Sequence, residues 1–221
     1  MLEYLNELDT TVLLAINGWN STFQDYFWWM MTAKWASVLM ALALVWVMLH
    51  KPRRYALLVL VSLALALVLA DQFSSSVIKP LVERLRPTHE PSLEGVIHII
   101  NGYHGGMFGF VSSHAANSFA VAMFLSLVFR RRIVTLSLFI WGALQCYSRM
   151  YVGVHYPGDI MGGIVVGLLA GWLVWCLMKW CQRRMRISNA VYTSIDGIVI
   201  ALSLVITLIA ITAVALYQAL G

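Results

Sequence analysis

Long apolar runs alternate with short polar gaps along most of this 221-residue chain. A helix that crosses a bilayer needs about 20 mostly apolar residues. The pattern predicts six such helices, at residues 27–49, 55–78, 113–129, 133–149, 158–178 and 195–218. Proline breaks helices, and the five prolines, at positions 52, 80, 87, 91 and 157, all fall at or outside the ends of these runs.

The segment before the first run, LEYLNELDTTVLLAING (residues 2–18), is too short to cross a bilayer. Apolar residues at positions 2, 5, 8, 12, 13 and 16 recur at helical spacing. They predict an amphipathic helix lying on the membrane surface. Because residues 1–25 have no basic start and include four acidic residues, we do not expect a cleavable signal peptide.

The composition agrees with this pattern, since 61% of the residues are hydrophobic and only 11% are charged. A soluble domain is usually about a quarter charged. We therefore expect an all-α integral membrane protein: one domain over residues 1–221, with six transmembrane helices preceded by an interfacial helix. The three cysteines are scattered along apolar runs, which predicts neither a disulfide framework nor a zinc site.

The basic residues predict the orientation. Most of them gather in the gaps after the first, third and fifth runs, at positions 51–54, 130–132 and 179–186. Cytoplasmic loops carry an excess of Lys and Arg, so these gaps are expected on the inner side of a bacterial cytoplasmic membrane. The same rule accounts for the net charge of +5 without a nucleic-acid partner. Nothing in the sequence indicates an obligate protein partner.

Other basic residues break this rule. Lys79, Arg84, Arg86 and Arg149 lie at the outward ends of the second and fourth runs, where an anionic ligand such as phosphate would compensate them. In KPLVERLRP (residues 79–87), Lys79 and Arg86 are seven residues apart, which predicts one face of a short helix. The alternative is that these side chains extend to the lipid headgroups. Lys34 and Asp71 lie deeper, where they could pair with each other.

A second polar stretch, GFVSSHAANSF (residues 109–119), begins the third run. Ser112 or Ser113 can cap this helix, with His114 in its first turn. Helix N-termini bind anions, and a histidine can move protons near neutral pH. A capped helix with an interfacial histidine is the alternative.

A third stretch, SRMYVGVHYPGD (residues 148–159), begins the fifth run. Pro157 is expected at the helix start, which places Asp159 in the first turn. That carboxylate can hydrogen-bond one imidazole nitrogen of His155 and leave the other free as a nucleophile. Compensation of the helix dipole is the alternative for Asp159, and it leaves Arg149 unexplained. Each of the three stretches lies at the outward end of a different run, so the fold can bring them to one depth.

Together these stretches resemble the type 2 phosphatidic acid phosphatase superfamily. Its first motif, Lys-x6-Arg-Pro, matches Lys79 to Arg86-Pro87, and its third, Ser-Arg-x5-His-x3-Asp, matches Ser148-Arg149, His155 and Asp159. The second, Pro-Ser-Gly-His, reads Val-Ser-Ser-His at residues 111–114, so the proline and the glycine are missing. The resemblance covers residues 79–159.

The resemblance implies a mechanism. His155 attacks phosphorus, Asp159 orients it, and His114 protonates the leaving oxygen and then activates water. The phosphoryl oxygens are held by Lys79, Arg86, Ser112, Ser113 and Arg149. No metal and no cofactor are expected, because no cluster of carboxylates accompanies these cations.

The resemblance also implies a lipid phosphate as the substrate. Lipid A phosphate and undecaprenyl pyrophosphate are favoured, and phosphatidylglycerol phosphate and phosphatidic acid are possible. Two other functions remain open: a lipid phosphotransferase with the same phosphohistidine, and an anion or lipid transporter without enzymatic activity.

The sequence also indicates how one helix packs. Gly163, Gly167 and Gly171 repeat every four residues along the fifth run and form a stripe of small residues. Such stripes let two membrane helices approach closely. We expect this one to pack against a neighbouring helix and to fix the direction of His155.

Overall fold

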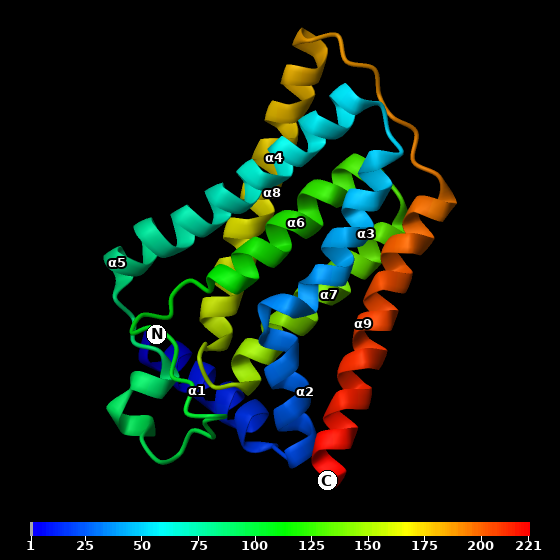
Figure 1. Cartoon of the computed structure of the whole chain (residues 1–221). Helices are drawn as coiled ribbons and strands as arrows, with labels where there is room; N and C mark the ends of the chain where they lie inside the picture. The colour runs from blue at the N-terminus through cyan, green and yellow to red at the C-terminus, as the bar shows by residue number, and fades with distance from the viewer. Residues whose placement is uncertain (1) are drawn as a thin grey trace.

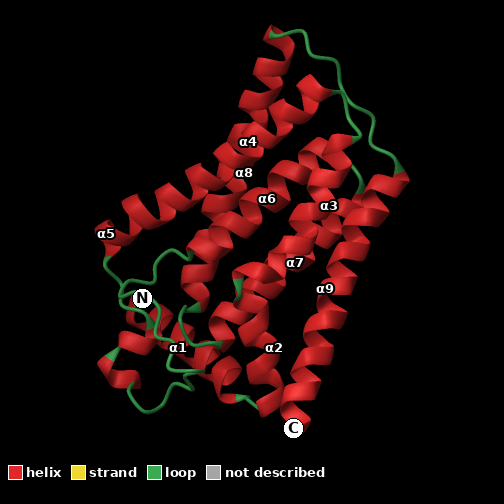
Figure 2. Ribbon diagram, in the orientation of Figure 1, coloured by secondary structure: helices red, strands yellow, loops and turns green. Residues whose placement is uncertain are grey.

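The computed structural model describes residues 2–221 and is almost entirely helical, with no strand in this range. Figure 2 shows long helices joined by loops, the longest of which lies beside the N-terminus. The helices are α1 (Leu2–Gly18), α2 (Thr22–Thr32), α3 (Val38–Leu49), α4 (Arg53–Gln72), α5 (Lys79–Val82), α6 (Ser113–Phe129), α7 (Arg132–Tyr151), α8 (Pro157–Arg184) and α9 (Ser194–Leu220). The all-α prediction is confirmed for the described residues.

Three helical segments are long and apolar enough to cross a membrane: Arg53–Val82, Pro157–Arg184 and Ser194–Leu220. The first is α4 continued into α5 through a π-helical stretch, Phe73–Ile78. A fourth span exists if α2 and residues 34–49, which bend by 65° at their junction, are counted as one. The chain is therefore an integral membrane protein, and the count of six spans stays a prediction.

The predicted single helix at 27–49 is wrong, because α2 ends at Thr32 and Ala33 is extended, with ψ of 144°. A helix end leaves carbonyl groups without intrahelical partners. Here the Gln145 side chain donates to the Met31 carbonyl at 2.8 Å, and the Arg149 guanidinium donates to the Thr32 hydroxyl. The break therefore supplies polar partners to α7 inside an apolar bundle.

The three basic gaps lie together at one end of the bundle, the upper end in Figure 1. There Lys51 pairs with Asp196 at 2.8 Å, and Arg131 donates to the Tyr192 carbonyl. Helix α1 and the long 83–112 loop lie at the opposite end. The polar stretches of the sequence therefore face away from the basic clusters, as the alternation of the runs predicts.

Helix α1 has the predicted bounds and two unlike faces. Leu13 and Asn17 are fully buried, whereas Tyr4, Leu5 and Leu8 are among its exposed apolar residues. The Asn17 amide donates to the carbonyls of His98, at 2.9 Å, and Tyr151, at 2.8 Å. These bonds fix the C-terminal end of α1 to the long loop and to α7, while its exposed apolar face is free to meet a membrane surface.

Helices α6 and α8 pack through the predicted glycine stripe. A Cβ atom on Gly163 would lie 2.5 Å from the Ser112 carbonyl oxygen, and one on Gly171 would lie 2.6 Å from that of Ala120. A Cβ on Gly167 would overlap the Ala116 carbonyl. The two backbones are thus in direct contact, which confirms that the stripe packs against a neighbouring helix and sets the first turns of α6 and α8 side by side; its effect on the direction of His155 stays a prediction.

We expect Gly167→Leu to lower the thermal stability of the protein, and with it any activity that needs His155 in place. Overpacking usually costs about 1–3 kcal/mol, and the Ala116 backbone cannot move aside as a side chain can. Val165→Leu, at a position of α8 that is 54% exposed, is the control. Equal melting temperatures for the two purified variants would contradict the packing role.

Candidate active site

His155 lies in the short loop between α7 and α8 and is 1% exposed. Its Nδ1 is 3.2 Å from Oδ2 of Asp159, which sits in the first turn of α8 because Pro157 begins that helix. With the proton on Nδ1, the ring donates to this carboxylate and leaves Nε2 unprotonated. The predicted spacing therefore gives the predicted pair.

The Asp159 carboxylate is fully buried and has a partner for each oxygen. Oδ2 also accepts the Tyr156 backbone N–H at 3.0 Å, which caps α8, and Oδ1 accepts from Arg84 at 3.1 Å. The Asp159 carbonyl accepts the Ser112 backbone N–H at 2.9 Å. One residue thus joins the 83–86 segment, the start of α6 and the start of α8.

Burial lowers the pKa of the His155 imidazole well below its usual range, and the nearby Arg86 and Arg149 cations lower it further. The ring is consequently neutral at neutral pH. A neutral imidazole with a free nitrogen is the form that can act as a nucleophile.

Two arginines carry donors without partners. Arg86 Nε donates to the Phe108 carbonyl at 3.1 Å, and Arg149 donates to the Tyr103 hydroxyl at 3.2 Å. Among residues 2–221, the buried Arg86 Nη1 and Arg149 Nε have no hydrogen-bond partner. Burial lowers the pKa of Arg86, and the adjacent Arg149 lowers it further. Buried polar groups normally have partners, so this pair is suited to hold an anion.

Lys79 reaches the same place from α5. Its Nζ donates to the Val111 carbonyl and, at 3.0 Å, to the Ser113 hydroxyl. Within residues 2–221, neither Lys79 nor either of the two arginines takes part in an ion pair. Three cations without carboxylate partners can offset the charge of a phosphate group.

The start of α6 forms as predicted. Ser112 is the N-cap, and its hydroxyl accepts the Ala115 N–H at 3.5 Å. Ser112 is fully buried, so its hydroxyl is committed to the cap. His114 is exposed and lies within electrostatic reach of His155, Arg86 and Arg149. An exposed imidazole beside a buried one can exchange protons with a leaving group or with water.

Two sequence predictions about charged residues are wrong. Lys79 and Arg86 do not share a helix face, because α5 ends at Val82 and Glu83 is left-handed, with φ of 50°. Arg86 instead lies in an extended segment whose backbone N–H donates to the Met107 carbonyl at 3.0 Å. No ion pair of the described chain joins Lys34 to Asp71, and Asp71 accepts from the Asn117 amide at 3.1 Å.

The sequence reading missed several residues that position the site. The sequence indicates Arg84 only as an outward cation, whereas in the structure it forms an ion pair with Asp159. Asp9 on α1, Thr32 on α2 and Tyr103 in the long loop contact site arginines from distant parts of the chain. No spacing rule links these residues to the motifs, so only the three-dimensional arrangement identifies them.

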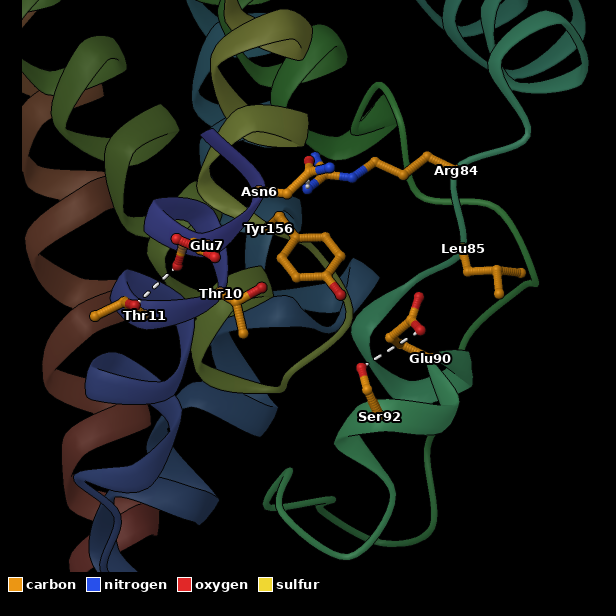
Figure 3. Close-up of a pocket in the computed structure, with 9 residues that line it drawn as sticks. All are labelled: Asn6, Glu7, Thr10, Thr11, Arg84, Leu85, Glu90, Ser92 and Tyr156. Atoms are coloured by element: carbon orange, nitrogen blue, oxygen red, sulfur yellow. Dashed lines mark hydrogen bonds between the residues drawn. The ribbon is translucent and has the colours of Figure 1, made fainter. Parts of the chain in front are cut away.

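Two cavities adjoin the site. One is a polar cavity of about 650 Å³ between α1 and residues 84–92. In Figure 3, Tyr156 lies between the two walls of this cavity and Arg84 reaches toward Asn6. An apolar cavity of about 260 Å³ lies among α3, α4, α6 and α7. Asn117, which lines it, is one helical turn from His114. A polar space beside Arg84 and an apolar space beside Asn117 suit an amphiphilic molecule.

The acidic, histidine and cysteine side chains are not grouped for metal binding in the described chain. In the part of the chain that the structure describes, no group of three or more His, Cys, Asp or Glu side chains could hold a metal ion. The groups that face His155 are Lys79, Arg86 and Arg149, which repel a metal cation and attract an anion.

Comparison with known proteins identifies the family of this chain. The family model of the PAP2 superfamily matches residues 55–183. The chain is 39% identical over 188 residues to a lipid A 4'-phosphatase of Bacteroides thetaiotaomicron, and the alignment covers 84% of each chain. It is 35% identical over 184 residues to a lipid A 4'-phosphatase of Porphyromonas gingivalis, covering 83% of this chain and 78% of the relative.

A solved structure shows the same fold. The crystal structure of a transmembrane PAP2-type phosphatidylglycerolphosphate phosphatase from Bacillus subtilis matches with a TM-score of 0.60 at 24% identity. The match covers 81% of this chain and 89% of that one. With the family model over more than half of its length and two relatives aligned over most of theirs, this chain belongs to the PAP2 superfamily.

Proposed function

We propose that this membrane phosphatase removes a phosphate from an envelope lipid through a phosphohistidine on His155. One observation carries the proposal. The imidazole of His155 is neutral and held by a carboxylate, and it lies near three cations that have no carboxylate partner within residues 2–221. Phosphoryl transfer depends mainly on positioning and on charge stabilisation. Both requirements are met by residues of the three motifs.

The first step forms a bond between His155 Nε2 and phosphorus as the bond from phosphorus to the leaving oxygen breaks. His114 donates a proton to that oxygen. A bound phosphate favours the protonated form of His114, because it places negative charge beside the imidazole. In the second step His114 takes a proton from water, the water oxygen attacks phosphorus, and the phosphohistidine bond breaks. The cations Lys79, Arg86 and Arg149 stabilise the charge on the phosphoryl oxygens in both steps.

Lipid A phosphate is the favoured substrate, with undecaprenyl pyrophosphate as the main alternative. Both relatives described above are named lipid A 4'-phosphatase and align over most of their length. The polar cavity supports a sugar headgroup, because Asn6, Glu7 and Thr10 offer amide, carboxylate and hydroxyl groups to sugar hydroxyls. A pyrophosphate of an isoprenoid alcohol has no sugar to place there.

We expect the purified protein to release phosphate from lipid A faster than from undecaprenyl pyrophosphate, phosphatidylglycerol phosphate or phosphatidic acid. Release without an added acceptor separates the phosphatase from a phosphotransferase and from a transporter. Because the site balances phosphate charge with Lys and Arg, release should persist in EDTA. Release that stops in EDTA and returns with magnesium would contradict this chemistry.

We expect labelled substrate to leave an acid-labile phosphohistidine on the wild-type protein and none on His155→Ala. His114→Ala should slow turnover by roughly 10²-fold or more, the usual scale for loss of a general acid. Quenched single-turnover reactions measure both. Label that persists in His155→Ala would exclude this residue as the nucleophile.

We place the site on the periplasmic side of the cytoplasmic membrane. Support comes from the three basic gaps at the opposite end of the bundle, since Lys and Arg favour the cytoplasmic side. Substrates would therefore come from the outer leaflet of that membrane.

This orientation can be tested with single cysteines in a background in which the three native cysteines are replaced by serine. Glu94→Cys, an exposed position in the long loop, should react with a membrane-impermeant thiol reagent on intact spheroplasts. Arg132→Cys, exposed at the other end, should react only after lysis. The reverse pattern would place the chemistry in the cytoplasm.

A further inference from the structure

A chain of charged contacts runs from the N-terminal helix to the imidazole of His155. Asp9 on α1 pairs with Arg84 at 2.8 Å, and Arg84 pairs with Asp159 at 3.1 Å. Asp159 in turn lies 3.2 Å from His155 Nδ1. Neither Asp9 nor Arg84 is one of the motif residues. Asp9 precedes His155 by 146 residues in the sequence.

Asp9 also contacts the helix that carries Asp159. Its Oδ1 accepts the Gly158 backbone N–H at 2.7 Å, in the first turn of α8. A Cβ atom on Gly158 would lie 2.6 Å from Asp9 Oδ2 and 3.3 Å from Arg84 NH1. A carboxylate is favourable at a helix N-terminus, and glycine lets it approach there. Asp9 therefore holds both Arg84 and the start of α8.

Arg84 is fixed on a second side by an aromatic ring. Its guanidinium carbon lies 4.2 Å from the centroid of Tyr156, the residue after His155. The side chains of Arg84 and Asp9 are 23% and 14% exposed. Arg84 is thus occupied by two carboxylates, which sets it apart from Lys79, Arg86 and Arg149.

We propose that Asp9 and Arg84 are positioning residues for the phosphoryl-transfer step. The inference rests on the proposed role of His155 as the nucleophile. Arg84 holds the Asp159 carboxylate ionised, so that its other oxygen keeps the imidazole in one tautomer and one orientation. Asp9 holds the planar guanidinium in place, which makes α1 part of the active-site structure.

Two other roles would give different results. Arg84 lines the polar cavity and could contact the headgroup of a substrate. The Asp9–Arg84 pair could also serve only to attach α1 to the rest of the protein. Loss of a headgroup contact would weaken the binding of one substrate class, and loss of an attachment would lower stability. Loss of a positioning pair would slow the chemical step for every substrate.

The test compares Asp9→Asn, Arg84→Gln and the double variant of the full-length protein. Each is assayed with the best lipid substrate and with p-nitrophenyl phosphate, a monoester without a sugar or a lipid part. We expect kcat to fall roughly 10–100-fold in each single variant, the usual scale for outer-shell partners of an active-site group. KM should change little, the loss should be equal for both substrates, and the yield of trapped phosphohistidine should fall in parallel.

The double variant should lose far less than the product of the single losses, because residues in one network are not additive. Asp9→Glu and Arg84→Lys keep the charges and should retain more activity than the neutral variants, which guards against loss of folding. The control is Glu83→Gln, which removes a charge beside Arg84 at an exposed residue that forms no ion pair within residues 2–221.

Unchanged kcat in both single variants would overturn the inference, as would a loss confined to KM for the lipid. A loss of kcat that simply follows a lower melting temperature, with additive single effects, would also overturn it and leave Asp9 as an anchor of α1. A wild-type protein that forms no phosphohistidine would refute the proposed function instead, and is recognised before any variant is made.

Discussion

The arrangement of this site depends on one buried carboxylate. Asp159 is fully buried at the start of an apolar helix, and an unpaired charge there would cost several kcal/mol. Its oxygens are satisfied by the Arg84 guanidinium, the His155 ring and the Tyr156 backbone N–H. These partners come from the segment after α5 and from the α7–α8 loop. Pairing of the one buried carboxylate therefore fixes the positions of these two segments relative to each other. The close contact of α6 with α8 then brings the second motif, at the start of α6, beside the start of α8.

The cations across from His155 have the opposite character. Arg86 and Arg149 have buried donors without partners, and no carboxylate of residues 2–221 pairs with either or with Lys79. Buried donors without partners cost stability, and an anion placed between these side chains would satisfy them, as the proposed function requires. Burial, and after it the field of these cations, lowers the pKa of the His155 imidazole and keeps the ring neutral. Arg84 is the exception, because its guanidinium pairs with the carboxylates of Asp9 and Asp159.

Local features of the site were predictable because they follow from short-range rules. Pro157 at a helix start, the four-residue spacing of His155 and Asp159, the Ser112 cap and the glycine stripe all appear in the fold as the sequence indicates. Features that depend on distant partners were not predictable. The break at Ala33 lies in a mostly apolar run, beside Thr32 and Lys34, and the partners of the broken end are Gln145 and Arg149, far along the chain. The helix expected to carry both Lys79 and Arg86 ends early because the 83–109 backbone makes its own bonds, including Gly109 N–H to the Arg84 carbonyl at 2.8 Å.

The departure of the second motif from the family pattern is absorbed by the same geometry. Ser113 stands where the family has glycine, yet it is the first residue of α6 and has no positive φ, so a side chain is tolerated there. Its hydroxyl accepts from Lys79, and the carbonyl of Val111, which replaces the proline, accepts from the same ammonium group. Close approach of backbone to the charged groups occurs instead at Gly109, where a Cβ atom would lie 2.7 Å from Asp159 Oδ2. In this chain the residues that replaced the proline and the glycine are therefore the ones that hold the Lys79 ammonium group.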